Sequence, residues 1–489
     1  MRNGLRQAAM AGGVLAIVII SMLRFIYAVD MPRTWDEVDF SLALSEFDLL
    51  AMQPHFPGYP YFILGGMIAH SVIEEPAKAL AYFNVTAGLL ASIPLYLIGR
   101  RFLASVQSIW MVVFIQALPF LSVNMSVPMS EGAAFSFLWW YIWAVLEAKK
   151  RGTWPFHLLA SFFFSLLMGI RLSYLLFGIG LLLLWLHDWG KKRSAARTGI
   201  LIGAAVLFQF IWVWALAATE GGLFPFLTLA FSFTEGHFQD WGGAISTEQQ
   251  SYGQRLFTLL FYNLIWVGLC GKSWAVCFGY AVLLLLLLVK KPALRNLYKH
   301  ELFLLAFAYL LWAFFAQNVE KPRHILPLPA FLIIFLFYSL KKAKILQIGY
   351  GMMAVMTGVQ FATSVQWLDE QHSERHAVYQ MADYLAERPP SFMIYTWEEI
   401  RVLQYLEVPY PHKRIQTFDY FLQEVRHSKY DTIFVTNHVL KGFEAQGADL
   451  DGQVEKVKTF TSNALFDPVY HEIVLYKVNL PSLKEVNAR

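Results

Sequence analysis

The chain has 489 residues, of which 57% are hydrophobic and 15% charged, and its mean hydropathy is +0.45. Soluble domains are about 45–50% apolar and about 25% charged, so this composition excludes an ordinary soluble protein and indicates a chain that crosses a membrane many times. The formal net charge of +4 is small and gives no reason to expect a nucleic-acid partner.

The first apolar segment, at residues 8–29, follows Arg2 and Arg6 and resembles a signal peptide. Its apolar run of about 20 residues is too long for a signal peptide, and no small-residue cleavage site stands out. We therefore expect an uncleaved first span. Ten further segments are long enough to cross a bilayer, and they lie at 79–98, 105–123, 130–147, 155–170, 172–187, 199–218, 273–289, 301–317, 325–340 and 345–365.

Two stretches allow more than one division into spans. Residues 155–187 are apolar apart from Arg171, and a single helix of that length would measure roughly 50 Å against a bilayer core of about 30 Å. We therefore expect two short helices with a turn near Arg171. Residues 256–289 are divided into one span at 273–289 and a preceding interfacial or re-entrant helix in "RLFTLLFYNLIWVG".

Lysine and arginine gather in alternate connections between the spans, as in the clusters at 149–151, 191–193, 290–291 and 341–344. Cytoplasmic loops carry such an excess. The sequence thus predicts a mainly α, polytopic helix bundle in the cell membrane, with about eleven spans and the N-terminus inside. Interfacial helices, the loops at 30–60 and 219–272, and the tail are then predicted to lie outside.

The sequence predicts a transmembrane domain at 1–365 and, after it, a separate extracytoplasmic domain at 366–489. "HAVYQMADYLAER", "EEIRVLQYLEV" and "DYFLQEVRHS" have helical periodicity, whereas "SFMIYTW", "YDTIFVTN" and "HEIVLYKV" are typical of strands. Strands that alternate with helices predict a small α/β domain.

The two cysteines, Cys270 and Cys277, both lie in an apolar region. Two cysteines are too few for a disulfide framework, and their spacing matches no metal site. We therefore expect neither a disulfide scaffold nor a metal centre from them.

The loop after the first span contains three carboxylates, Asp36, Glu37 and Asp39, in "RTWDEVDFSLAL". They could be a solvated cap at the membrane edge. However, Trp35 and Phe40 bracket them, and a carboxylate held against apolar surface is desolvated and has the raised pKa that suits a general base. The proline-rich "QPHFPGYPYFILGG" follows and predicts a rigid, non-helical turn.

Other ionisable groups lie at the predicted outer ends of spans. Such groups are costly at membrane depth and suggest a functional site. Plainer roles remain open, because an acid at a helix N-terminus is favoured by the helix dipole and an arginine can extend its head group to the interface. The candidates are His55, Glu131, Arg171, Lys321, Arg323 and His324.

These residues carry a resemblance to a known family. "WDEVDF" resembles the Trp-Asp-Glu-x-x-Phe motif in the first outer loop of the protein O-mannosyltransferases and their bacterial relatives, which belong to the GT-C superfamily of polytopic glycosyltransferases. "QPHFPGYP" is similar to the His-Pro-Pro-rich stretch that follows there, and "YLIGRRF" and "KPRHILPLP" match the general pattern. The resemblance covers roughly residues 8–345. It departs from the family at Asp39, where histidine is common, and at Phe56, where a proline is expected.

The resemblance implies a glycosyltransferase that moves a sugar from a polyprenyl-phosphate donor to a cell-envelope glycan, lipid or protein on the outer face, with inversion. It implies that Asp36 is the catalytic acid–base residue, or the ligand if a divalent cation such as Mg²⁺ or Mn²⁺ takes part, and that Glu37 is the neighbouring acid. Arg171, Lys321 and Arg323 are then suited to the departing phosphate. Further substrate contacts are expected from Asp39, His55, Glu131 and His324.

Two other functions stay open at this point. A transporter or lipid flippase would place polar groups and broken helices near the bilayer midplane, whereas here the ionisable groups gather at the outer ends of spans. A non-catalytic relative could act as an assembly partner through its tail.

Overall fold

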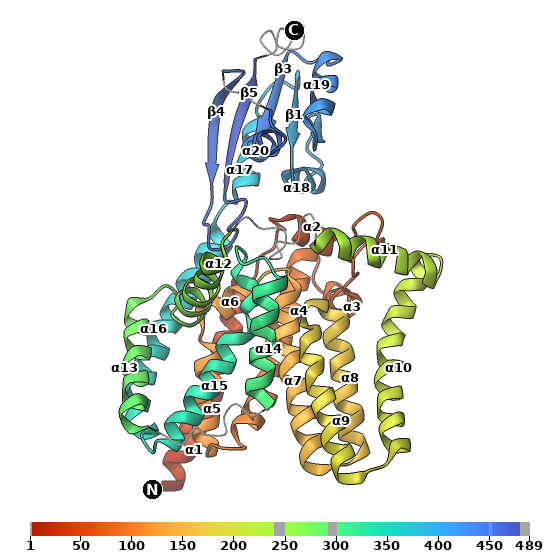
Figure 1. Cartoon of the computed structure of the whole chain (residues 1–489). Helices are drawn as coiled ribbons and strands as arrows, with labels where there is room; N and C mark the ends of the chain where they lie inside the picture. The colour runs from red at the N-terminus through yellow and green to blue at the C-terminus, as the bar shows by residue number, and fades with distance from the viewer. Residues whose placement is uncertain (1, 239–249, 292–300, 449, 451, 480–489) are drawn as a thin grey trace. The chain divides into compact units, whose positions relative to one another are not determined.

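The computed structural model describes residues 2–238, 250–291, 301–448, 450 and 452–479 (Figure 1). The chain divides into two compact units. The helical unit consists of Met1–Asp30 and Phe40–His372, and the tail unit consists of Met31–Asp39 and Ser373–Arg489.

The helical unit is built almost entirely from helices that run alongside one another (Figure 1). In chain order they are α1 (Arg2–Ile26), α3 (Pro60–His70), α4 (Pro76–Gly99), α5 (Ser105–Gln116), α6 (Pro119–Met125), α7 (Ser130–Arg151), α8 (Trp154–Ile170), η1 (Leu172–Gly178), α9 (Ile179–Lys192), α10 (Ala195–Thr219), α11 (Leu223–Gly236), α12 (Tyr252–Phe257), η3 (Thr258–Leu269), α13 (Trp274–Lys290), α14 (Glu301–Ala316), η5 (Pro322–Ile325), α15 (Pro327–Lys342) and α16 (Leu346–Ser373). Helix α2 (Trp35–Leu42) carries residues of both units.

Several of these helices could cross a membrane. Within the described residues, five are long and apolar enough, or up to seven if each of two bent helix pairs counts as one span. Each apolar segment that the sequence singled out overlaps a helix. The multi-pass helical architecture is therefore confirmed, while the number of about eleven crossings and the inside position of the N-terminus stay predictions.

The helices are interrupted at the two places where the sequence predicted it. Helix α8 ends at Ile170, and Arg171 has an extended backbone with φ −157° and ψ 104° before η1 begins. The second ambiguous stretch contains two helical pieces, Tyr252–Leu269 and Trp274–Lys290, which are bent by 108° relative to each other.

The sequence did not predict that the two cysteines pair with each other. Cys270 and Cys277 form a disulfide, with their Cα atoms 5.3 Å apart. Cys270 follows η3 and Cys277 lies in the first turn of α13, so the bond joins the two sides of the sharp bend. A count of cysteines could not reveal a bend that brings these two together.

Helix α7 is the central element of the helical unit, because it packs against α4, α8 and α9. Most of its residues are buried, among them Trp139 and Tyr141 as well as several alanines. Small residues allow membrane helices to approach closely. Its N-terminal turn is consequently held in place by its neighbours.

The tail unit contains a five-stranded sheet in the order β2-β1-β3-β5-β4. The strands β2, β1 and β3 are parallel, and β5 and β4 are antiparallel to their neighbours. In chain order the elements are α17 (Ala377–Ala386), β1 (Phe392–Thr396), α18 (Glu399–Tyr405), β2 (His412–Arg414), α19 (Phe418–Arg426), β3 (Thr432–Thr436), α20 (Asn437–Ala445), β4 (Val454–Thr461) and β5 (Glu472–Val478). The predicted α/β character is confirmed, although the boundary at 365/366 stays a prediction.

The sequence did not reveal β2, α20 and β4. Strand β4 carries Lys456 and Lys458 and lies at the edge of the sheet. Charged residues on an edge strand discourage pairing with other chains, but they also weaken the apolar pattern by which strands are recognised. The central strands β1 and β3 are nearly all buried and were found for that reason.

A buried carboxylate stabilises the tail unit near neutral pH. Asp467 is 5% exposed, and its Oδ2 lies 3.2 Å from Nε2 of His376. The backbone N–H groups of Val469 and Tyr470 donate to Oδ1. Burial alone would raise the pKa of Asp467, but His376 and these two donors outweigh it and hold the pKa at about 2.

This lowered pKa predicts acid-sensitive stability of the tail unit. Because the folded pKa lies below the ordinary 3.8, charged Asp467 contributes roughly 2 kcal/mol at neutral pH, and this is lost as the pH falls from about 4 to about 2. Asp467→Asn should remove the contribution. Hydrogen–deuterium exchange of the β3 amides, corrected for intrinsic rates, measures it. The exposed Asp431→Asn is the control, and equal protection in both variants would contradict the prediction.

Candidate functional site

Three charged side chains from separate elements meet at one end of the helical unit. Glu131 lies in the first turn of α7 and its side chain is 1% exposed. Its Oε1 lies 3.1 Å from Nη2 of Arg171, before η1, and 3.0 Å from Nε of Arg323, in η5. The structure thus brings together three of the predicted site residues, with one carboxylate shared between two guanidinium groups.

The position of Glu131 is fixed by Asn84 of α4. The Asn84 side chain donates to the carbonyls of Val127 and Met129 and accepts from the N–H of Ala133, at 2.8–2.9 Å. The close approach requires glycine at 132, because a Cβ there would lie 2.9 Å from Cγ of Asn84. Sequence reasoning missed Asn84 as a positioning residue, although a polar side chain within the apolar segment 79–98 was a signal.

Arg171 is held at the break between two helices. Its backbone N–H donates to the carbonyl of Leu167, and its own carbonyl accepts from Tyr174. Its Nη1 donates to Oγ of Ser130, at 2.9 Å. The Arg171 guanidinium therefore contacts two consecutive residues, Ser130 and Glu131. The sequence did not predict Ser130 as a site residue.

Lys321 and His324 belong to the same region as Arg323. The Nδ1–H of the His324 ring donates to the carbonyl oxygen of Asn318 at 3.0 Å, and the carbonyl of His324 accepts from the hydroxyl of Tyr309. Arg171, Arg323 and Lys321 all act electrostatically on His324. Three cations are thus gathered at this end of the helical unit.

Aromatic side chains border the arginines. Tyr309 stacks on Phe177 with ring centroids 4.8 Å apart and packs against Tyr174 at 5.2 Å. Tyr59 acts electrostatically on Arg171, and its hydroxyl lies 3.1 Å from Nε2 of His55. His55 is thus a hydrogen-bond partner of Tyr59. Tyrosines are common in apolar sequence, so the sequence offered no reason to select Tyr59, Tyr174 or Tyr309 as site residues.

The three acids after the first span have different surroundings within the tail unit. Asp36 and Glu37 both lie in the first turn of α2. Glu37 accepts from the backbone N–H of Arg33 at 2.6 Å and lies 3.7 Å from its Nε. Asp39 is fully buried, and its Oδ1 accepts from Nε of Arg401 at 2.7 Å. Asp36 is half-buried, and the catalytic and binding roles of all three stay predictions.

Trp35 lies against two cations in the tail unit. The guanidinium of Arg414 lies 4.9 Å from its ring centroid and that of Arg401 lies 5.7 Å away. Arg414 is also 4.7 Å from the ring of Trp397. Cation–π contacts of this kind stabilise partly desolvated sites, so they hold the start of α2.

The residues around Asp36 do not form a recognisable metal site. No group of three or more His, Cys, Asp or Glu within the described part of the chain could hold a metal ion. The neighbouring carboxylates of Glu37 and Asp39 are engaged by Arg33 and Arg401. We therefore derive no step through a metal, and the divalent cation stays a prediction.

No protein-family model and no curated protein sequence matches the chain. A solved structure that is similar is ArnT from Cupriavidus metallidurans bound to undecaprenyl phosphate, with 11% identity, a TM-score of 0.55, and coverage of 96% of this chain and 98% of that one. The oligosaccharyltransferase of Archaeoglobus fulgidus in complex with Zn and sulfate is 12% identical over 86% of this chain and 67% of that one, with a TM-score of 0.45. The agreement with ArnT over nearly the whole of both chains establishes the architecture that the sequence motifs implied. The chain therefore has the fold of ArnT.

Proposed function

We propose that the protein is an integral-membrane glycosyltransferase that moves a sugar from a polyprenyl-phosphate donor to an acceptor on the outer face of the membrane. The observation that carries the proposal is the pair of guanidinium groups, Arg171 and Arg323, which meet on the single carboxylate of Glu131. ArnT, which has the same fold, binds undecaprenyl phosphate. This supports a lipid phosphate as the ligand of the arginines.

The reaction needs a group that stabilises the departing phosphate. As the bond between the sugar C1 and the phosphate oxygen breaks, negative charge develops on the phosphate. Guanidinium groups bind phosphate oxygens through two parallel N–H donors, and donors fixed in advance stabilise a transition state most effectively. Glu131 and Ser130 hold Arg171 in one orientation, which is the arrangement that such catalysis requires.

The reaction also needs a base for the acceptor hydroxyl. We assign this role to Asp36, in the first turn of α2, with Glu37 as its neighbour. The acceptor oxygen bonds to C1 while the phosphate leaves from the opposite side, and its proton passes to Asp36. This direct displacement inverts the configuration at C1. Further contacts to the donor or acceptor are proposed for Asp39, His55, Lys321 and His324.

The acceptor is a cell-envelope glycan, lipid or protein in this proposal. The test incubates the purified full-length protein with a radiolabelled pool of polyprenyl-phosphate sugars and extracted envelope material, and measures label that leaves the lipid fraction. Arg171→Ala, assayed at equal protein concentration, is the reference. Equal release by the wild type and this variant across the whole pool would refute the proposal.

The proposed orientation places the tail unit outside the cytoplasm. The basic clusters at the predicted inner ends of spans and an odd number of spans require it. A reporter enzyme that is active only outside the cytoplasm, fused after Arg489, should therefore be active, whereas the same reporter inserted after Arg193 should be inactive. Activity of the second fusion alone would mean that the orientation is reversed.

A further inference from the structure

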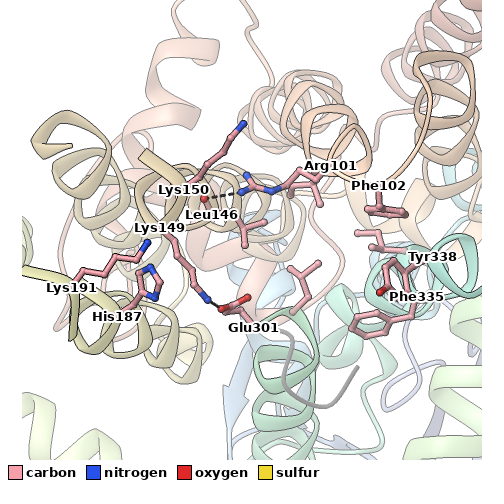
Figure 2. A pocket seen from close by; sticks show the side chains of 13 residues that line it. Arg101, Phe102, Leu146, Lys149, Lys150, His187, Lys191, Glu301, Phe335 and Tyr338 are labelled. Atoms are coloured by element: carbon pink, nitrogen blue, oxygen red, sulfur yellow. Dashed lines mark hydrogen bonds and ion pairs between the residues drawn. The ribbon is translucent and has the colours of Figure 1, made fainter. Parts of the chain in front are cut away.

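A cavity lies in the helical unit, away from the arginine pair. It has a volume of about 460 Å³, and Figure 2 shows the side chains that line it. They come from the last two turns of α7 and α9, the first turn of α14, the end of α4 with the residues after it, and α15. Glu131 lies in the first turn of α7, and Lys149 and Lys150 lie in the last turn of the same 22-residue helix. At about 1.5 Å per residue, the two sites are separated by roughly the thickness of a bilayer core.

The cavity has more positive than negative charge. Its lining includes the cations Arg101, Lys149, Lys150 and Lys191, and one acid, Glu301. Lys149 forms an ion pair with Glu301 (Figure 2). Lys149 is also within electrostatic range of Lys191 and Arg101, and these three like charges repel one another.

Two of the cations carry charge that no neighbouring acid neutralises. Arg101 pairs with Glu147 at 2.9 Å, and Lys149 pairs with Glu301. Lys150 and Lys191 form no ion pair with any residue that the structure describes. Their side chains are exposed, so a ligand can reach them.

Apart from His187, the remaining wall of the cavity is apolar. It contains aliphatic and aromatic side chains, namely Ile98, Phe102, Leu146, Leu302, Ile334, Phe335 and Tyr338. A soluble anion would gain nothing from this wall, whereas the acyl chains of a lipid would bury apolar surface against it. Cationic groups beside an apolar wall therefore fit a molecule with an anionic head and a hydrocarbon tail.

We propose that this cavity binds the phosphate headgroup of an anionic phospholipid in the inner leaflet. Basic pockets between membrane helices on the cytoplasmic side attract such headgroups, and the cavity lies at the end of α7 that carries the basic cluster Lys149, Lys150 and Arg151. The proposal does not depend on the glycosyltransferase activity.

The test measures lipid binding to the purified full-length protein in nonionic detergent by native mass spectrometry. The probes are dioleoyl phosphatidylglycerol, dioleoyl phosphatidylcholine and the soluble glycerol 3-phosphate. The double variant Lys150→Ala/Lys191→Ala should bind phosphatidylglycerol roughly 25-fold more weakly, since each cation near a membrane surface contributes about fivefold. Lys192→Ala/Lys290→Ala removes two exposed cations from the ends of α9 and α13 that do not line the cavity, and should bind as the wild type does.

A variant that is expected to strengthen lipid binding distinguishes the loss of a binding site from a loss of structure. Glu301→Gln removes the carboxylate that competes for Lys149 and should strengthen phosphatidylglycerol binding. Three results would each overturn the proposal: equal binding of phosphatidylcholine, an equal loss in the control variant, or weaker binding in Glu301→Gln. Binding of glycerol 3-phosphate as tight as that of the lipid would replace the lipid with a soluble phosphate and would also overturn it.

Discussion

Asp36→Asn should lower the rate of sugar transfer by about 10²–10⁴-fold, which is the usual contribution of a general base. The amide has nearly the shape of the carboxylate but cannot accept the proton of the acceptor hydroxyl. Because Asp36 is half-buried in the first turn of α2, the exchange should leave expression and membrane insertion unchanged. Transfer is measured with saturating donor, so that the loss appears in kcat.

The control for this variant is Glu46→Gln, which removes an exposed acid from the same predicted outer loop. It should transfer sugar at the wild-type rate. Near wild-type turnover in Asp36→Asn would show that another group takes the proton. In that case Glu37→Gln is the next variant to assay, although its carboxylate already accepts from Arg33.

Arg171→Ala and Arg323→Ala should each weaken the use of the polyprenyl-phosphate donor by roughly 10- to 150-fold in kcat/KM, since a hydrogen bond to a charged group contributes about 1.5–3 kcal/mol. Arg→Lys at either position should restore only part of the loss, because lysine keeps the charge but lacks the planar fork. The measurement is a titration of the donor at fixed acceptor.

Lys78→Ala is the matched control, because Lys78 is a cation in the first turn of α4 that is not part of the ion pairs on Glu131. It should leave the donor dependence unchanged. If both arginine variants also show wild-type donor dependence, the phosphate must bind elsewhere, and Lys321→Ala becomes the variant to test.

The burial of an arginine in this protein does not by itself indicate an anion-binding site. Arg24 is fully buried, yet it donates to the side chain and carbonyl of Gln116 and to Oγ of Ser122. These neutral oxygens satisfy its donors within the helical unit. Arg171 differs because its ion-pair partner, Glu131, is shared with a second guanidinium, and this distinction is invisible in the sequence.

The sequence by itself determined the helical architecture, the break at Arg171 and the α/β character of the tail. Each of these follows from local patterns: apolar runs of bilayer length, a charge that interrupts such a run, and alternating strand and helix periodicities. The motifs around Asp36 and Arg323 likewise indicated the fold that the likeness to ArnT establishes.

Only the tertiary structure decided which of the candidate residues meet. Glu131 lies in α7, Arg171 between α8 and η1, and Arg323 in η5. Asp39 pairs with Arg401, 362 positions further along the chain. The disulfide between Cys270 and Cys277 depends on a bend of 108° that no residue count predicts. Local periodicity reflects backbone hydrogen bonding and the solvent on each face, whereas these contacts depend on how helices pack, and packing is set by the whole chain.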